Sequence, residues 1–146
     1  MKFRRTALLV APVSLLLLVV PAGAVSTAPQ WHAAKVISLP SGATGLPNGF
    51  LPALSCPSAG NCTAAGTYYT NLSASPSTQN VFVASEVGGN WWAARVPAGL
   101  LALNTAGYAS VAGLGCAAAA NCVVGGDYDA AAGQGAFLLA EIPWRG

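Results

Sequence analysis

Charged side chains are scarce in this 146-residue chain, which contains six Lys or Arg, four Asp or Glu, and one His. Half of the basic residues lie within the first five positions. Without residues 1–24 the formal charge becomes −1, from three basic and four acidic residues. The remaining chain has no basic patch for a phosphate backbone, so we expect no nucleic acid partner.

The surface of the folded chain must consist largely of Ala, Gly, Ser, Thr and Asn, because so few charged residues are present to cover it. A surface of this kind predicts self-association, as a dimer or trimer, or a crowded extracellular environment. The roughly 120 residues that follow the first 24 suffice for one modest domain.

The N-terminus has the three parts of a secretory signal peptide. Its basic residues are Lys2, Arg4 and Arg5. Residues 6–20 are apolar, and small residues lead up to Ala24. This pattern predicts cleavage after Ala24, with an uncleaved anchor or a cut near Ala28 as the alternatives. The apolar run is shorter than a membrane span requires, so we expect a secreted protein of the bacterial cell envelope, with no membrane association after cleavage.

Residues 25–146 contain one pattern twice, with an offset of 60 positions. The two copies centre on residues 54–62 and 114–122 and extend over 31–97 and 98–146. Identical residues recur at these paired positions: Leu54 and Leu114, Cys56 and Cys116, Asn61 and Asn121, Cys62 and Cys122, Gly66 and Gly126, Tyr68 and Tyr128. Self-similarity at a fixed period is typical of repeat architectures. We therefore predict one domain built from two equivalent units.

Each unit is expected to contain four β-strands, which we label a to d, and no segment has convincing helical periodicity. The expected strands are 31–39, 50–56, 62–70, 81–87, 91–96, 109–116, 122–129 and 135–142. Along the chain the order is d, a-b-c-d, a-b-c. The first strand could therefore complete the second unit and protect its edge. The fold class is all-β: two four-stranded antiparallel propeller-like blades, or a small two-sheet sandwich, with a truncated gene as a third alternative.

The four cysteines form two Cys-x5-Cys pairs, each at the mouth of an expected hairpin. Facing residues of an antiparallel pair lie about 4.5–5.5 Å apart, a separation that a disulfide accepts. In an exported protein the natural pairs are Cys56–Cys62 and Cys116–Cys122, whereas the other two connectivities would join different repeats. Structural zinc favours closer spacings, so no metal is expected.

The first repeat contains Ser55-Cys56-Pro57-Ser58, Cys62-Thr63-Ala64-Ala65-Gly66-Thr67-Tyr68, Phe82-Val83-Ala84-Ser85-Glu86 and Trp91. With these residues, the chain over 31–146 resembles the tandem repeats of secreted actinobacterial proteins. Those repeats are similar to the Asp-box repeats of sialidase-like β-propellers, which implies a propeller-type blade. Only Glu86 stands near the Asp-box aspartate, and Gly-Asn-Trp replaces Gly-x-Thr-Trp. The resemblance implies a fold and no activity, because the Asp box is a structural turn.

Few residues are candidates for chemistry, and no pattern predicts a cofactor. His32 is the only histidine and has no evident catalytic partner. The candidate ligand-binding residues are Trp92, Tyr69, Tyr128, Asp127 and Asp129. Exposed aromatic rings stack on sugars, and two carboxylates at i and i+2 could bind calcium, although ordinary packing and turn roles explain the same residues.

We predict a secreted, non-catalytic β-repeat protein that acts as an extracellular structural or interaction module. The alternative is a lectin-like module that binds a cell-wall or surface glycan. A fragment of a propeller enzyme is the third and least favoured hypothesis. A glycosidase would need two facing carboxylates, whereas the glutamates of this chain stand at structural positions of the repeat.

Overall fold

The computed structural model describes residues 31, 33–41, 43, 49–70 and 77–141. It divides into a unit Met1–Ala33, of which only Trp31 and Ala33 are described, and a unit Ala34–Gly146. The expected signal peptide, His32 and the C-terminal residues 142–146 lie outside the described residues.

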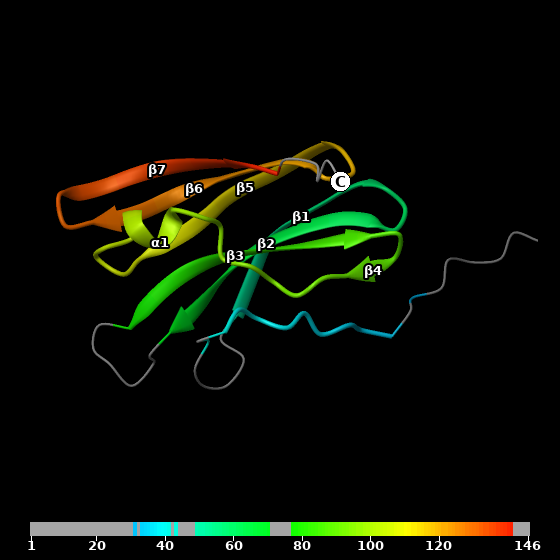
Figure 1. Ribbon diagram of the computed structural model, residues 1–146, viewed down its shortest axis with the longest axis horizontal. Coiled ribbons are helices and arrows are strands. Elements are labelled where there is room, and N and C mark those ends of the chain that lie inside the picture. The colour runs from blue at the N-terminus through cyan, green and yellow to red at the C-terminus, as the bar shows by residue number, and fades with distance from the viewer. Residues whose placement is uncertain (1–30, 32, 42, 44–48, 71–76, 142–146) are drawn as a thin grey trace, which may run out of the picture. The chain divides into compact units, whose positions relative to one another are not determined.

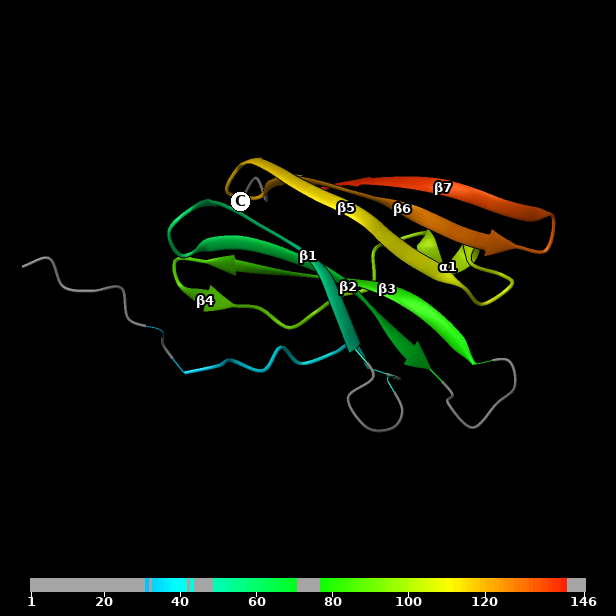
Figure 2. The same ribbon diagram turned by 180° about the vertical axis from the view of Figure 1, so that it is seen from behind.

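The second unit contains two antiparallel sheets, which confirms the all-β class. The strand order of the first sheet is β1 (Gly49–Ser58), β2 (Asn61–Thr70), β3 (Thr78–Val87) and β4 (Asn90–Trp91). The strand order of the second sheet is β5 (Ala109–Ala118), β6 (Asn121–Ala130) and β7 (Gly133–Ala140). The short helix α1 (Leu100–Leu103) lies in the connection between the sheets (Figure 1). Figure 2 shows from behind that the sheets form two layers.

Both repeats begin with the same disulfide-linked hairpin. The connections β1–β2 and β5–β6 turn at Gly60 and Ala120, which share the left-handed backbone conformation with φ of 71° and 53°. Disulfides join Cys56 to Cys62 and Cys116 to Cys122, each with a Cα–Cα distance of 4.0 Å. Both predicted pairings are confirmed. The offset of 60 positions therefore reproduces a local structure as well as a sequence.

One face of the first sheet, its back face, is covered by chain segments that flank the sheet. Side chains alternate between faces along a strand, so Tyr68 of β2 and Phe82 of β3 lie on this side. Their ring centroids are 6.4 Å apart, and both rings are buried. Ile37 and Leu39 pack against this aromatic cluster. The N-terminal segment thus shields the largest apolar side chains of the first sheet.

The opposite face of the first sheet packs against the second sheet and forms the main core. The buried side chains of this core come from both layers and from α1: Ala65, Val81, Leu100, Ala109, Val124 and Phe137. Hydrogen bonds also cross between the layers. The Cys116 N–H donates to Ser55 Oγ at 3.1 Å, and Gln79 Nε2 donates to the Ala109 carbonyl at 2.8 Å.

The two sheets stack front to back. Ala64 and Val124 are equivalent positions in the repeat. Val124 of β6 lies in the core between the sheets, but the residue of β2 that lies in this core is Ala65, the neighbour of Ala64. Strand alternation then places Ala64 on the back face of the first sheet. Equivalent faces of the two repeats therefore point in the same direction. This arrangement fits both a two-sheet sandwich and a pair of successive blades.

The first expected strand does not complete the second sheet, which has three strands. None of the described residues of 31–39 is in a strand. Instead, the Ala94 N–H donates to the Ser38 carbonyl at 3.0 Å, beside the first sheet. The burial of Tyr68 and Phe82 explains this correction, because Ile37 and Leu39 cover the rings that the sheet alone would leave exposed.

The fourth strand of the first sheet is shorter than the expected 91–96. Regular pairing is confined to β4, and one isolated bridge joins Val83 to Arg95. The Trp92 N–H also donates to the Ser85 carbonyl at 2.9 Å. Residues 90–96 therefore run along β3 as an interrupted strand.

Candidate functional site

The outward side of the second sheet is an exposed surface with two charged side chains, Asp127 and Asp129, and we call it the outer face. It consists of Ser110, Gly113, Gly115, Val123, Gly125, Asp127, Asp129, Gln134, Ala136, Leu138 and Ala140, as strand alternation and register place them. Leu138 is 81% exposed, and Val123 is also exposed. A Cβ added at Gly113 or Gly115 would meet no atom within 4 Å. The centre of this face is thus nearly flat and apolar, with a shallow hollow of about 830 Å³ over the glycines.

In the first sheet, the positions equivalent to the outer face are buried. Val123 and Gly125 correspond to Thr63 and Ala65 by the offset of 60, and both of these lie against the second sheet. The third strands of the two repeats, β3 and β7, correspond with an offset of 55 positions. This offset follows from the pairing, because the equivalent glycines Gly66 and Gly126 face Phe82 and Phe137. Leu138 is therefore equivalent to Val83, which packs against the core. The outer face repeats a surface that this chain already buries once.

The five candidate ligand-binding residues do not form one site. Asp127 and Asp129 lie on the outer face, where the Ser110 hydroxyl donates to Asp127 Oδ1 at 2.8 Å. Tyr128 points the opposite way, packs against the main core and lies over Gly135. Tyr69 is half-buried on β2.

Trp92, the fifth candidate, lines a hollow of about 550 Å³ beside β3 and the C-terminal end of β7. The apolar lining includes Val83 and Val87, and the charged lining residues are Arg95 and Glu141. Trp92 is 60% exposed. The hollow lies between the residues that follow β4, which include Trp92 and Arg95, and Glu141, which follows β7. An indole, a guanidinium and a carboxylate therefore share one open space.

Glu141 links the two sheets at the edge of this hollow. The Ser85 hydroxyl donates to Oε1 at 2.8 Å, and the Thr63 hydroxyl donates to Oε2 at 3.2 Å. The Thr63 oxygen also lies 3.2 Å from Sγ of Cys122. A second hollow of about 260 Å³ borders the same three residues Thr63, Ser85 and Glu141. The repeat pattern predicts a structural role for Glu141, and these hydrogen bonds show that its carboxylate joins the second sheet to the first.

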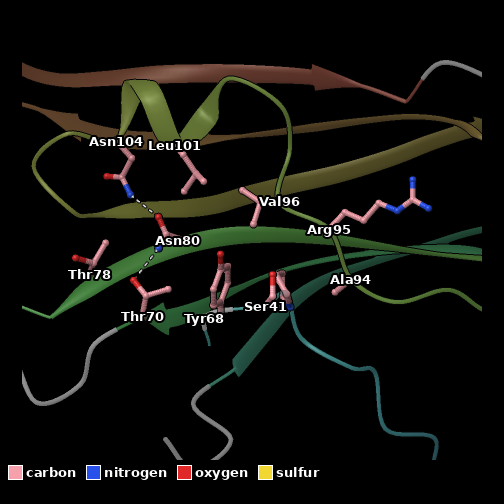
Figure 3. Close-up of a pocket in the computed structure, with 11 residues that line it drawn as sticks. Ser41, Tyr68, Thr70, Thr78, Asn80, Ala94, Arg95, Val96, Leu101 and Asn104 are labelled. Carbon is pink, nitrogen blue, oxygen red and sulfur yellow. Dashed lines mark hydrogen bonds between the residues drawn. The ribbon is translucent and has the colours of Figure 1, made fainter. Parts of the chain in front are cut away.

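A hollow of about 640 Å³ with both polar and apolar lining residues opens beside the back face (Figure 3). On one side Asn104 Nδ2 donates to Asn80 Oδ1 at 3.1 Å, and Asn80 Nδ2 donates to Thr70 Oγ1 at 3.3 Å. Burial raises the pKa of Tyr68, which lines the same hollow. Arg95 also borders it. Nothing in the repeat pattern singles out Asn104, because it lies in the connection between the two sheets, and position 44 of the first repeat is a threonine.

Among the described residues, no three His, Cys, Asp or Glu side chains are grouped so that they could hold a metal ion. Within the same part of the chain, no helix is both long and apolar enough to cross a bilayer. The two disulfides are compatible with an extracellular location.

In comparisons with protein-family models, curated proteins and solved structures, the chain has no significant match.

Proposed function

We propose that this protein is a secreted, non-catalytic structural or interaction module that associates with a second copy of itself through the outer face. One observation carries the proposal: the outer face is the repeat equivalent of the surface that the first sheet buries against the second. Leu138 stands where Val83 is packed. A flat apolar sheet face of this kind is stabilised when another sheet covers it.

The dimer is expected to be two-fold symmetric, with outer face against outer face. Continuing the front-to-back stacking would instead require the back face of a second copy. That face is covered by Ile37 and Leu39 of its own chain. An isologous contact needs no rearrangement and closes at two subunits.

The secreted, non-catalytic part of the proposal is supported by the disulfides and by the positions of the carboxylates. Asp127 and Asp129 lie on the outer face, whereas Glu141 lies between the sheets and accepts two hydroxyl hydrogen bonds. These carboxylates therefore do not face one another across a common cleft, as the pair in a glycosidase does.

The substitution Leu138→Glu tests the outer face. Each dimer would lose the burial of two leucines, about 1.5–3 kcal/mol apiece, and would bring two carboxylates together. The dimer dissociation constant should rise at least about tenfold, since each 1.4 kcal/mol is a factor of ten. Light scattering after size exclusion, over a range of concentrations, measures this change.

Leu54→Glu is the matched control, because Leu54 is 58% exposed on β1 and lies away from the outer face. We expect this variant to retain the mass of the wild-type assembly. Equal dissociation constants for the Leu138→Glu and wild-type proteins would refute the proposed contact.

Glycan binding is the second candidate function, and the exposed indole of Trp92 beside Arg95 and Glu141 favours it. An aromatic face with nearby charged groups suits stacking and hydrogen bonding to a sugar. In a glycan array, Trp92→Ala should reduce any signal at least about tenfold, the loss expected when an aromatic contact of about 1.5 kcal/mol is removed. Phe50→Ala, which removes an exposed ring outside this hollow, should leave the signal unchanged. An array without signal for the wild-type protein would rule this candidate out.

A further inference from the structure

The second sheet ends at β7, whereas the equivalent strand of the first sheet, β3, is followed by a further paired segment. Among the described residues, β7 is paired only with β6. Its equivalent in the first sheet, β3, also pairs with residues 90–96, through β4 and through the Val83–Arg95 bridge. An unpaired edge presents a row of free N–H and C=O groups that another strand can join. The position of a fourth strand beside β7 is therefore open along the described part of the chain.

The space beneath this position is also open. In the first sheet, Ala94 belongs to the cluster on the back face, and Trp91 and Val96 pack against this cluster. In the second sheet, the equivalent residues of a strand beside β7 would face the space between the sheets, where Phe137 and the hollows of about 550 and 260 Å³ lie. Val83, Val87 and Leu139 provide apolar lining there. A strand with small and aromatic side chains on one side would fit this space.

The chain contains a segment with that pattern. Residues 31–36 and 91–96 share the sequence Trp-x-Ala-Ala-(Lys/Arg)-Val at the repeat offset of 60. Trp31 is fully exposed, Val36 is 91% exposed, and Ala34 between them is exposed. The residues equivalent to the packed side chains Trp91, Ala94 and Val96 are therefore without a packing partner in the described structure.

We propose that the edge of β7 accepts residues 31–36 from a second copy of this chain as the fourth strand of the second sheet. The register follows from the first sheet, where Arg95 faces Val83. The equivalent pair is Lys35 of one copy and Leu138 of the other. Addition of an extended segment to a free sheet edge is an established mode of recognition, because the backbone hydrogen bonds supply affinity and alternate side chains supply specificity.

The donor strand must come from another copy as long as Ser38 stays hydrogen-bonded to Ala94 of the same chain. Ser38 accepts a hydrogen bond from Ala94 in the layer of the first sheet. Two residues span at most about 7 Å, whereas packed sheets lie about 10 Å apart. Val36 of the same chain therefore cannot lie in the layer of the second sheet. Exchange of an identical element between copies satisfies both constraints.

This contact uses the edge of β7 and does not depend on the proposed outer-face dimer. Two single-cysteine variants of the mature chain, Lys35→Cys and Leu138→Cys, distinguish the two contacts when they are mixed and oxidised mildly. The added thiol is the only free one, since all four native cysteines are bridged. Peptide mapping should identify a mixed 35–138 disulfide between the two chains.

The substitution Val36→Asp in the Lys35→Cys chain should lower the yield of this disulfide at least about tenfold, because the proposed register would place a carboxylate beside the buried ring of Phe137. Val36→Ile is the matched control and should retain the yield. Gln134→Cys, on the same side of β7 but four residues from Leu138, should not cross-link with Lys35→Cys.

Absence of the mixed disulfide, or an equal yield with Val36→Asp, would overturn the strand exchange. A 138–138 disulfide alone would overturn it while supporting the outer-face dimer. A chain with both substitutions that closes on itself as a monomer would show that the donor strand comes from the same copy, which also overturns the proposal.

Discussion

Replacement of Gly126 by alanine should destabilise the folded protein by about 3 kcal/mol or more, the upper range for overpacking a core. A Cβ at this position would collide with the Ser110 backbone oxygen and would come within 2.7 Å of Cζ of Phe137. The oxygen belongs to the paired strand β5, and Phe137 is buried between the sheets. Neither can move without breaking a ladder or opening the core.

Gly113→Ala is the matched control, because a Cβ there would meet no atom within 4 Å. We expect its free energy of unfolding to stay within about 0.5 kcal/mol of the wild-type value. Gly66→Ala should behave like Gly126→Ala, since its Cβ would come within 2.8 Å of Cζ of Phe82. Urea unfolding followed by circular dichroism, at one fixed protein concentration, measures all three. Wild-type stability of Gly126→Ala would contradict the close approach of Phe137.

Removal of the second disulfide should cost more than removal of the first. Both link cysteines six positions apart, and cross-links that close such short loops contribute about 2–3 kcal/mol each. Cys122 is buried and its sulfur contacts Thr63 between the sheets, whereas Cys56 is exposed. Replacing Cys116 and Cys122 by alanine should therefore cost about 1 kcal/mol more, for the cavity that the missing sulfur leaves.

The double variants Cys56→Ala with Cys62→Ala, and Cys116→Ala with Cys122→Ala, serve as controls for one another because loop length is the same in both. Chemical denaturation at fixed protein concentration gives the two losses of stability. If the first pair proved the more costly, the contact between Cys122 and Thr63 would not contribute to the interface as described.

Several structural features followed from the sequence because they depend on residues close together in the chain. The Cys-x5-Cys spacing predicted both disulfides, and the expected strands 50–56 and 62–70 predicted the hairpin of β1 and β2. A ligand-binding role for the aromatic and aspartate candidates stays a prediction, and the structure does not bring all of these residues together in one site. Tyr128 faces the core and Asp127 faces outward, although they are neighbours, because alternation along β6 separates them.

What the sequence determined by itself was the repeat, the hairpins, the cysteine pairing and the all-β class, since local spacing and alternation specify each of them. The tertiary structure decided where residues 31–39 go. Their resemblance to 91–96 suggested the edge of the second sheet, but Ile37 and Leu39 pack instead against the buried rings of Tyr68 and Phe82. It also decided that the sheets stack front to back, because only the packed layers show which face of each repeat is covered. Among the residues that the structure describes, that choice leaves the outer face and the edge of β7 uncovered.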